Sequence, residues 1–224
     1  MNFLSHYYFD RNHPALKVVG SLLPDLIKNA GVNKIKSPLK NIDLLEDNSY
    51  TDLLAGWRNH IEVDKYFHSS DFFLHHSQAL KEDIKVVTEG SEVRPSFLGH
   101  IALELILDHL LIQQNLIQVG NLYVALQEAD KEIIASFILQ CNEQEIDRVL
   151  EFIQKFSASK YLLSYQKMEN IAYALNRICM RLWPVSLQED KVALLHKKID
   201  SYAKRYESEL MEIFPEIESR LQIH

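Results

Sequence analysis

Apolar residues recur along this chain at intervals of three and four, which is the spacing of one face of an α-helix. The clearest run lies near the C-terminus and comprises Val192, Leu195, Ile199, Tyr202, Tyr206, Leu210 and Ile213. The alternation of apolar and polar residues that marks a strand is not sustained in any part of the sequence. We therefore predict that the chain folds mainly into helices.

Prolines and breaks in the spacing divide the chain into separate helices. Pro95 fits the first turn of a helix, where its missing N–H costs little, and Pro184 separates the last two predicted helices. Besides the C-terminal helix, the spacing predicts helices at about 14–29, 49–76, 95–118, 121–137, 143–156 and 159–182. Repeats, low-complexity tracts and long linkers are absent from the sequence. These features predict one all-α domain, a helical bundle over residues 1–224.

The composition is that of a folded domain. Of the 224 residues, 47% are hydrophobic, which is enough for a substantial core. A net charge of −7 argues against a general nucleic-acid binder, because neutralising phosphates requires a clustered basic surface. No stretch approaches the roughly 20 apolar residues of a membrane span, and the first residues lack the pattern of a secretion signal. We expect a cytoplasmic protein.

Two sets of polar residues with a four-residue spacing give the strongest indication of chemistry. The first is His60, Asp64 and His68, and the second is His100, Glu104 and Asp108. Residues at i, i+4 and i+8 project from neighbouring positions on one face of a helix, so each set forms a strip of possible metal ligands. Two strips that face each other across a helical bundle could hold a metal ion.

Further candidates lie in the first half of the chain, where eight of the ten histidines fall between residues 6 and 109. Asp25 is surrounded by apolar residues, and a buried acid is costly unless it is paired or bound to a cation. His6 and His109 add imidazoles close to apolar runs. We therefore expect residues 1–118 to contribute most of the site.

Imidazole and carboxylate ligands without thiolates suit manganese, iron(II), zinc or, with more carboxylate, magnesium. Such an ion can orient a phosphate ester, polarise its oxygens and activate a water molecule, although lyase and oxygenase chemistry are also compatible. The plainer interpretation of His60 and Asp64 is an ordinary helix-stabilising pair. Four histidines are interpreted as surface or hydrogen-bonded core residues: His13, His75, His76 and His196.

Four segments carry a recognisable order of motifs. They are Met1-Asn2-Phe3-Leu4-Ser5-His6, Gly20-Ser21-Leu22-Leu23-Pro24-Asp25, Gly56-Trp57-Arg58-Asn59-His60-Ile61-Glu62-Val63-Asp64 and Ile101-Ala102-Leu103-Glu104-Leu105-Ile106-Leu107-Asp108-His109. In this order they resemble the acyl carrier protein phosphodiesterase family, a divergent branch of the HD-type metal phosphohydrolases. Weaker likeness continues to Phe214-Pro215, so the resemblance covers nearly the whole chain.

The resemblance implies an HD-like bundle that removes the 4′-phosphopantetheine arm from holo acyl carrier protein, with manganese as the metal. Zinc, iron(II) and magnesium are the alternatives. The metal ligands expected from it are Asp25, His60, Asp64, Glu104 and Asp108. Catalytic roles are expected for His6, Asp25 and His109.

The chain departs from the family pattern at several of these positions. The two arginines that follow the first family histidine are replaced by Ile61 and Glu62. His68 and Glu104 each stand where the family has aspartate, and His100 has no counterpart. These departures bear on the substrate more than on hydrolysis itself.

An acyl carrier protein is typically acidic, so a chain that is itself net negative needs a local basic surface to bind it. A run of lysines without an acid before Asp43 is the candidate contact, with Arg58 and Arg94 as possible additions; it comprises Lys28, Lys34, Lys36 and Lys40. A solvated surface loop is the alternative interpretation.

Two other functions fit the same residues. Zinc phospholipase C and related single-strand nucleases are all-α enzymes with repeated His-x-x-x-Asp/Glu pairs, which His60/Asp64 and His100/Glu104 satisfy. Those enzymes are secreted and use an N-terminal tryptophan as a ligand, whereas this sequence starts at methionine. The third hypothesis is a non-catalytic helical binding module, in which His60, Asp64 and Asp108 are hydrogen-bonded core residues.

Overall fold

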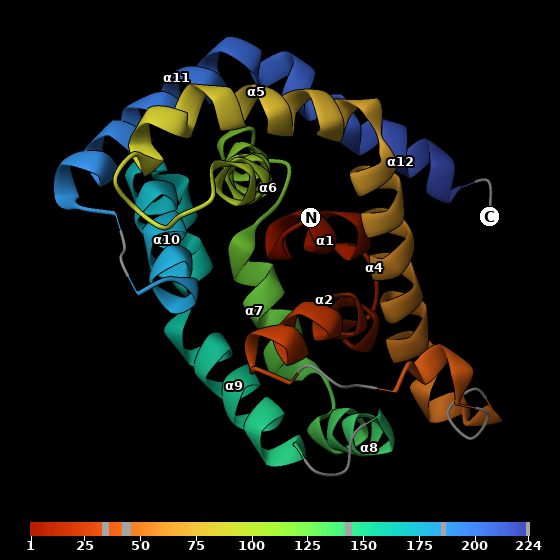
Figure 1. Ribbon diagram of the computed structural model, residues 1–224. Coiled ribbons are helices and arrows are strands. Elements are labelled where there is room, and N and C mark those ends of the chain that lie inside the picture. The colour runs from red at the N-terminus through yellow and green to blue at the C-terminus, as the bar shows by residue number, and fades with distance from the viewer. Residues whose placement is uncertain (33–35, 42–45, 142–144, 185–186, 223–224) are drawn as a thin grey trace. The chain divides into compact units, whose positions relative to one another are not determined.

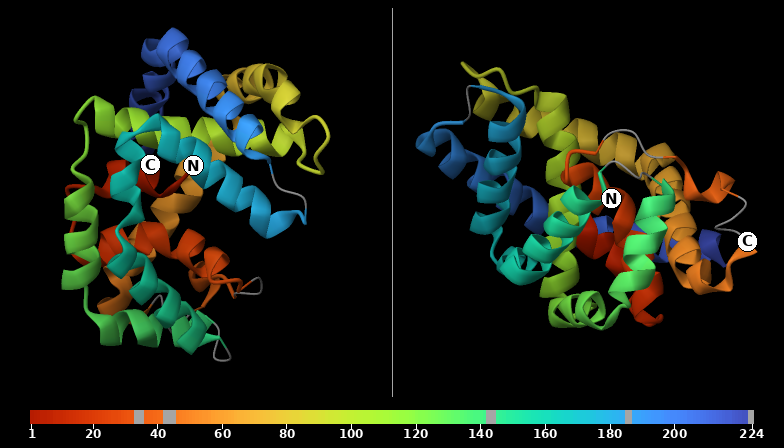
Figure 2. Two further views of the ribbon diagram at one scale, coloured as in Figure 1. Left: turned by 90° about the vertical axis from the view of Figure 1, so that its left-hand side faces the viewer. Right: turned by 90° about the horizontal axis from the view of Figure 1, so that it is seen from below.

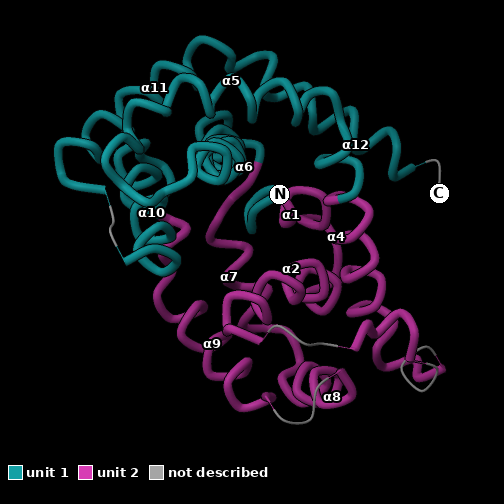
Figure 3. Tube along the Cα trace, viewed as in Figure 1, with its two compact units in different colours: residues 1–5, 65–116, 164–224 teal, residues 6–64, 117–163 magenta. Residues whose placement is uncertain are grey.

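The computed structural model in Figure 1 describes residues 1–32, 36–41, 46–141, 145–184 and 187–222. Every regular element in these ranges is an α-helix or a 3-10 helix, so the all-α prediction is confirmed. The chain groups into two compact units, each assembled from separate segments (Figure 3). Unit 1 comprises residues 1–5, 65–116 and 164–224, and unit 2 comprises residues 6–64 and 117–163. One domain over residues 1–224 stays a prediction.

Unit 1 is built around α6 (Pro95–Gln113), which packs against α5 (Asp71–Thr88), α10 (Met168–Leu182) and α11 (Glu189–Met211). α5 and α11 lie side by side in all views, and α12 (Ile213–Leu221) follows α11 (Figures 1 and 2). By length and composition α6 could cross a membrane, but 67% of its apolar window is buried. Burial on all sides is typical of the central helix of a large core.

Unit 2 places α2 (Ala15–Asn29) against α7 (Val119–Glu128) and α9 (Ile146–Ser159). α8 (Lys131–Cys141) packs on α9. The first helix of the chain is α1 (Phe3–Asp10), and α4 (Thr51–Ser69) carries the first strip of candidate ligands. Among the described residues there are also three 3-10 helices: η1 (Pro38–Lys40), η2 (Asn48–Tyr50) and η3 (Tyr161–Gln166).

Two segments predicted as single helices are each divided in the structure by a capping residue. The predicted helix 49–76 is α4 and α5, and Ser70 between them accepts a hydrogen bond from Phe73 N at 3.0 Å. The predicted helix 121–137 is α7 and α8, and Asp130 Oδ1 accepts bonds from Glu132 N and Ile133 N at 2.9 and 3.1 Å. A side chain that satisfies the free N–H groups of a new first turn favours a break at that point.

α1 was not predicted from the sequence. All but one of its eight residues are buried, so it has no polar face and gives no amphipathic spacing. The other predicted helices agree with the structure to within a few residues, except at four places. α6 ends at Gln113, α5 continues to Thr88, and the C-terminal run is shared between α11 and α12. The predicted helix 159–182 is α10, which begins only at Met168 and is preceded by a 3-10 helix over Tyr161–Gln166.

Candidate metal centre

The backbones of α2 and α4 approach each other closely in unit 2, next to the candidate ligand His60. A Cβ atom on Gly56 of α4 would lie 2.1 Å from Lys17 O of α2, and one on Gly20 of α2 would lie 2.4 Å from Leu53 O of α4. Only glycine leaves room for backbones this close. His60 is one helical turn beyond Gly56, and its Nδ1 reaches the backbone oxygen of Ser21 at 2.8 Å.

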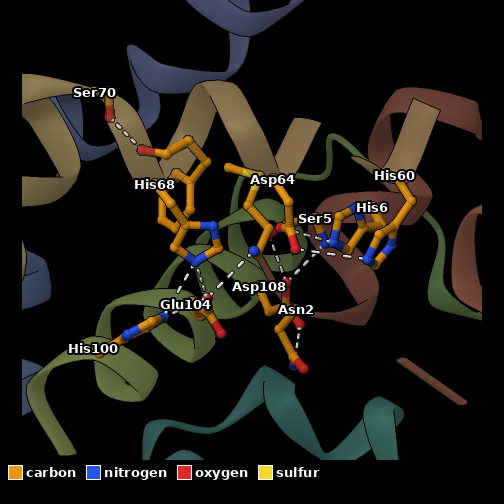
Figure 4. Close-up of polar contacts among 12 residues, drawn as sticks. Asn2, Ser5, His6, His60, Asp64, His68, Ser70, His100, Glu104 and Asp108 are labelled. Carbon is orange, nitrogen blue, oxygen red and sulfur yellow. Dashed lines mark hydrogen bonds and ion pairs between the residues drawn. The ribbon is translucent and has the colours of Figure 1, made fainter. Parts of the chain in front are cut away.

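Three of the expected site residues meet in this unit (Figure 4). The rings of His6 and His60 stack with their centroids 3.8 Å apart and their planes 18° from parallel. Asp64 lies across from both, with Oδ1 3.3 Å from His6 Nε2 and Oδ2 3.6 Å from His60 Nε2. The contacts bring two imidazoles and a carboxylate together from α1 and α4, and we call these three residues the His6 group.

The protonation states of the His6 group suit a cation. The Ser21 carbonyl can only accept, so His60 Nδ1 carries the hydrogen and His60 Nε2 keeps its lone pair. Burial lowers the pKa of His6 and of His60 to about 4, so both rings are neutral at pH 7. Burial alone would raise the pKa of Asp64, but the adjacent His6 outweighs it and holds that pKa below its usual value.

The ring nitrogens of His6 are buried without hydrogen bonds in the described part of the chain. The 3.3 Å contact between His6 and Asp64 lacks hydrogen-bond alignment. A buried polar atom without a partner calls for an explanation such as a bound ion. Two neutral imidazoles and one ionised carboxylate are ligands that manganese, iron(II) and zinc accept. The donor set therefore fits the metal that the sequence led us to expect.

Glu104, which the sequence predicted as a ligand, belongs to a different group in unit 1. Its Oε1 lies 3.3 Å from His68 Nε2 and 3.1 Å from His100 Nε2, and the two Nε2 atoms are 3.3 Å apart. The amino group of Met1 is 3.3 Å from the same oxygen. Burial alone would raise the pKa of Glu104, but Met1 and the two histidines together hold it well below its usual range. We call His68, His100 and Glu104 the His68 group.

Asp108 is fully buried in unit 1, where it accepts hydrogen bonds from the start of α1. The donors are Asn2 Nδ2 at 2.8 Å, Leu4 N at 3.2 Å, Ser5 N at 2.8 Å and Ser5 Oγ at 2.7 Å. Two of them are backbone N–H groups of the first turn, which have no partner within the helix. Burial raises the pKa of Asp108 to about 6 despite these bonds. Its contacts are those of a tertiary helix cap, and its role as a metal ligand stays a prediction.

The remaining expected residues, Asp25 and His109, are not in the groups of three converging ligand atoms found among the described residues. Asp25 is partly buried on α2. His109 is buried on α6, and its Nδ1 donates to the Tyr165 carbonyl at 2.7 Å, which leaves Nε2 as the ring's lone-pair nitrogen. Their metal-binding and catalytic roles stay predictions.

Sequence reasoning did not assign a role to the Ser21 carbonyl, because any residue type supplies a backbone oxygen. The four-residue spacing included His68 and His100 among the possible ligands, but the ligand set implied by the family resemblance left them out. The interpretation of His76 as a hydrogen-bonded core residue agrees with the structure. It is buried, with Nδ1 2.7 Å from the Tyr202 hydroxyl and Nε2 3.2 Å from Glu209 Oε1.

A family model described as acyl carrier protein phosphodiesterase matches residues 1–217, which include the His6 and His68 groups. The chain belongs to the acyl carrier protein phosphodiesterase family. Searches of curated proteins and of solved structures find no match. The family name is that of a phosphodiester hydrolase, so the expected class of reaction is confirmed at the level of the family.

Proposed function

We propose that this family member hydrolyses the phosphodiester that joins 4′-phosphopantetheine to a serine of holo acyl carrier protein, using a divalent metal held by the His6 group. Manganese is the metal we expect there. The observation that supports the proposal most is the convergence of two neutral imidazoles and one ionised carboxylate. Both ring nitrogens of His6 are buried there, and neither has a hydrogen-bond partner among the described residues. The family match supports a carrier-protein substrate over a phospholipid or a single-stranded nucleic acid.

A divalent ion in the His6 group would supply a Lewis acid that polarises the phosphate ester and activates water. The residues of the group determine where such an ion sits. His60 is oriented by its bond to the Ser21 carbonyl, and His6 is fixed by stacking on His60. The side chain of Asp64 is 34% exposed, so the group is open to solvent on the Asp64 side.

The reaction balances without a redox partner. The oxygen of water forms a bond to phosphorus, and the bond from phosphorus to the serine oxygen breaks. A carboxylate or an imidazole takes a proton from the water, and the serine oxygen receives one as it leaves. The products are the apo carrier and free phosphopantetheine.

Three of the four lysines proposed to contact the carrier lie among the described residues. Lys28, Lys36 and Lys40 are exposed in unit 2. Lys34 and Asp43, which belong to the same stretch, lie outside the described residues. Exposed ammonium groups can attract an acidic carrier in spite of the net charge of −7. We propose these lysines as the surface that the carrier contacts.

The metal dependence is tested with Asp64→Asn, which removes the ionised ligand from a partly exposed position. We expect hydrolysis of a simple aryl phosphodiester to fall at least about a hundredfold, and manganese affinity in equilibrium dialysis to fall with it. Glu62→Gln is the matched control, because Glu62 is also a partly buried carboxylate on α4 and is outside the His6 group. Unchanged turnover and metal affinity in Asp64→Asn would refute the proposal.

A further inference from the structure

We propose that the His68 group is a second divalent-metal site, of the three-ligand tetrahedral kind that zinc prefers. Its ligands would be His68 Nε2, His100 Nε2 and Glu104 Oε1. This inference rests on the geometry of unit 1 and does not depend on the function proposed for the His6 group.

The three donor atoms form a nearly equilateral triangle with edges of 3.1, 3.3 and 3.3 Å. Zinc binds nitrogen and carboxylate oxygen at about 2.0–2.2 Å, and a regular tetrahedron with bonds of that length has edges of about 3.3–3.6 Å. One zinc ion can therefore reach all three atoms with little movement. Two histidines with one glutamate are a known ligand set of zinc sites that keep a fourth position open.

Helical spacing and packed aromatic rings hold the triangle in place. His100 and Glu104 are four residues apart on α6, and His68 lies in the last turn of α4. The Phe73 ring packs edge-on against both imidazoles, with centroids 4.9 Å from that of His68 and 4.9 Å from that of His100. Ligands fixed by their surroundings bind a metal with a smaller loss of side-chain freedom.

The His68 group is accessible from solvent. The side chains of His68 and His100 are 34% and 41% exposed, whereas that of Glu104 is 13% exposed. His100 also lines a surface cavity of about 530 Å³ whose wall includes Arg94 and Trp183. An ion can enter by this route and keep a water molecule or a small oxygen ligand in its fourth position.

The competing account is a cluster held together by protons and by the Met1 amino group, which lies 3.3 Å from Glu104 Oε1. In that account one imidazole is protonated and donates to Glu104, and zinc adds nothing. His76 illustrates such an ordinary arrangement, because a hydroxyl and a carboxylate contact its two nitrogens separately. The ligand atoms of His75, His76 and Glu209 also converge, within 4.8 Å of one another, but Tyr202 and Glu209 already contact the two nitrogens of His76. In the His68 group, by contrast, all three ligand atoms lie 3.1–3.3 Å from one another.

The test is titration of chelator-treated protein with Zn²⁺ and with Co²⁺, whose visible absorption is strong when it is tetrahedral. We expect a tetrahedral Co²⁺ spectrum in the wild type, and its loss in His100→Ala and Glu104→Gln. Zinc affinity at this site should fall by more than the roughly 10–100-fold that follows removal of a residue that only hydrogen-bonds to a ligand. His13→Ala changes an exposed histidine that is outside the groups of converging ligand atoms, and it should leave both the spectrum and the affinity unchanged.

Asp64→Asn separates this site from the function proposed above. A tetrahedral spectrum that persists in Asp64→Asn and disappears in His100→Ala supports a second site, whatever the hydrolytic activity. Equal zinc affinity in wild type and His100→Ala would overturn it. If Glu104→Gln fails to fold, ¹⁵N-imidazole spectra of the wild type decide the question. Zinc must then shift the Nε2 resonances of His68 and His100, and unshifted resonances overturn the site.

Discussion

A single hydrogen bond fixes the tautomer of His60 in the form that the proposed metal site requires. The Ser21 carbonyl fixes the hydrogen on Nδ1, and burial keeps the ring neutral at pH 7. Nε2 is then a lone-pair donor near the Asp64 carboxylate. The ring needs neither to lose a proton nor to rotate when an ion binds, and both would reduce affinity.

The same burial predicts a pH dependence of stability for the metal-free protein. The pKa of His6 and of His60 is about 4 in the folded chain against the ordinary 6.5. Between these values the unfolded chain binds protons that the folded chain does not, so the free energy of unfolding should fall as the pH falls from 6.5 towards 4. The slope is at most about 1.4 kcal/mol per pH unit for each histidine.

Asp108 acts in the opposite sense, because its raised pKa lets the folded chain take up a proton between about pH 6 and 3.8. His60→Gln isolates the histidine contribution. We expect denaturant titrations in chelator to show a shallower loss of stability in this variant than in the wild type between pH 6.5 and 4. Parallel curves would show that the pKa of His60 is the same in the folded and in the unfolded chain.

Replacing Asp108 by Asn separates a helix cap from a metal ligand. An amide has one acceptor oxygen, so the donors of Leu4 and Ser5 cannot all keep their partners. We expect a loss of at least about 2 kcal/mol in the free energy of unfolding, since each buried donor left unpaired costs about 1–3 kcal/mol. Asp200→Asn, at a surface pair with Lys204, should cost under about 1 kcal/mol.

The metal affinity of folded Asp108→Asn completes the comparison. If Asp108 is only a helix cap, Asp108→Asn should lose less manganese affinity than Asp64→Asn does, as measured by equilibrium dialysis. An equal or larger loss in Asp108→Asn would make Asp108 a direct ligand, as the sequence alone suggested.

At this scale the four-residue spacing paired His60 with Asp64 and His100 with Glu104, because both pairs are local to one helix. It could not assign His6 to Asp64, since that contact joins residues from separate helices and depends on tertiary packing. For the same reason it placed Glu104 and Asp64 in one ligand set, whereas the structure puts Glu104 with His68 and His100.

The close packing of α2 and α4 is the feature of the elements on which the His6 group depends. A methyl group on Gly56 would overlap Lys17 O and Ser21 N, at 2.1 and 2.6 Å. We expect Gly56→Ala to lower the free energy of unfolding by about 2–3 kcal/mol, and to weaken metal binding by displacing the Ser21 carbonyl from His60. Thermal unfolding and metal titration of the same variant measure the two effects.

Gly120 in α7 is the matched control, because a Cβ atom there meets no described atom within 4 Å. Gly120→Ala should raise stability by up to about 1 kcal/mol, since alanine is the better helix former. A Gly56→Ala protein as stable as the wild type would show that the two helices can move apart at little cost.

Helix boundaries were the least predictable feature of the elements. The segment around Ser69-Ser70-Asp71 has the composition of a helix start, yet the apolar spacing runs on through it and predicted one continuous helix. α1 gave the opposite difficulty, because a helix buried on nearly all sides has no polar face to reveal it. In both cases tertiary packing, rather than local spacing, determined the element.

For the molecule as a whole, the spacing of apolar residues predicted the all-α fold. The expectation of a hydrolase came from the family resemblance, because imidazole and carboxylate ligands are equally compatible with lyase and oxygenase chemistry. The division into two units, each assembled from distant segments, was not foreseen. Composition changes little between these segments, so no linker or change of charge marks the boundary. Only the contacts between helices reveal it.

The exposed lysines of unit 2 are the basic surface that we propose for carrier binding, and their charge can be reversed by mutation. We expect the triple change of Lys28, Lys36 and Lys40 to glutamate to raise KM for holo carrier about tenfold or more, because a negative surface repels an acidic partner. Hydrolysis of a small aryl phosphodiester should be unchanged. The control for net charge is a second triple variant, in which three surface lysines of unit 1 are replaced by glutamate: Lys81, Lys85 and Lys197. Equal carrier KM in the two triple variants would remove the lysines from the contact.

The central claim is tested most directly by mass spectrometry of holo acyl carrier protein incubated with the purified protein and manganese. The account predicts a carrier lighter by its phosphopantetheine arm with the wild type and with Glu62→Gln. The carrier should stay intact with Asp64→Asn or in the presence of a chelator. Cleavage that continues at the wild-type rate in both of those conditions would contradict a metal-dependent reaction at the His6 group.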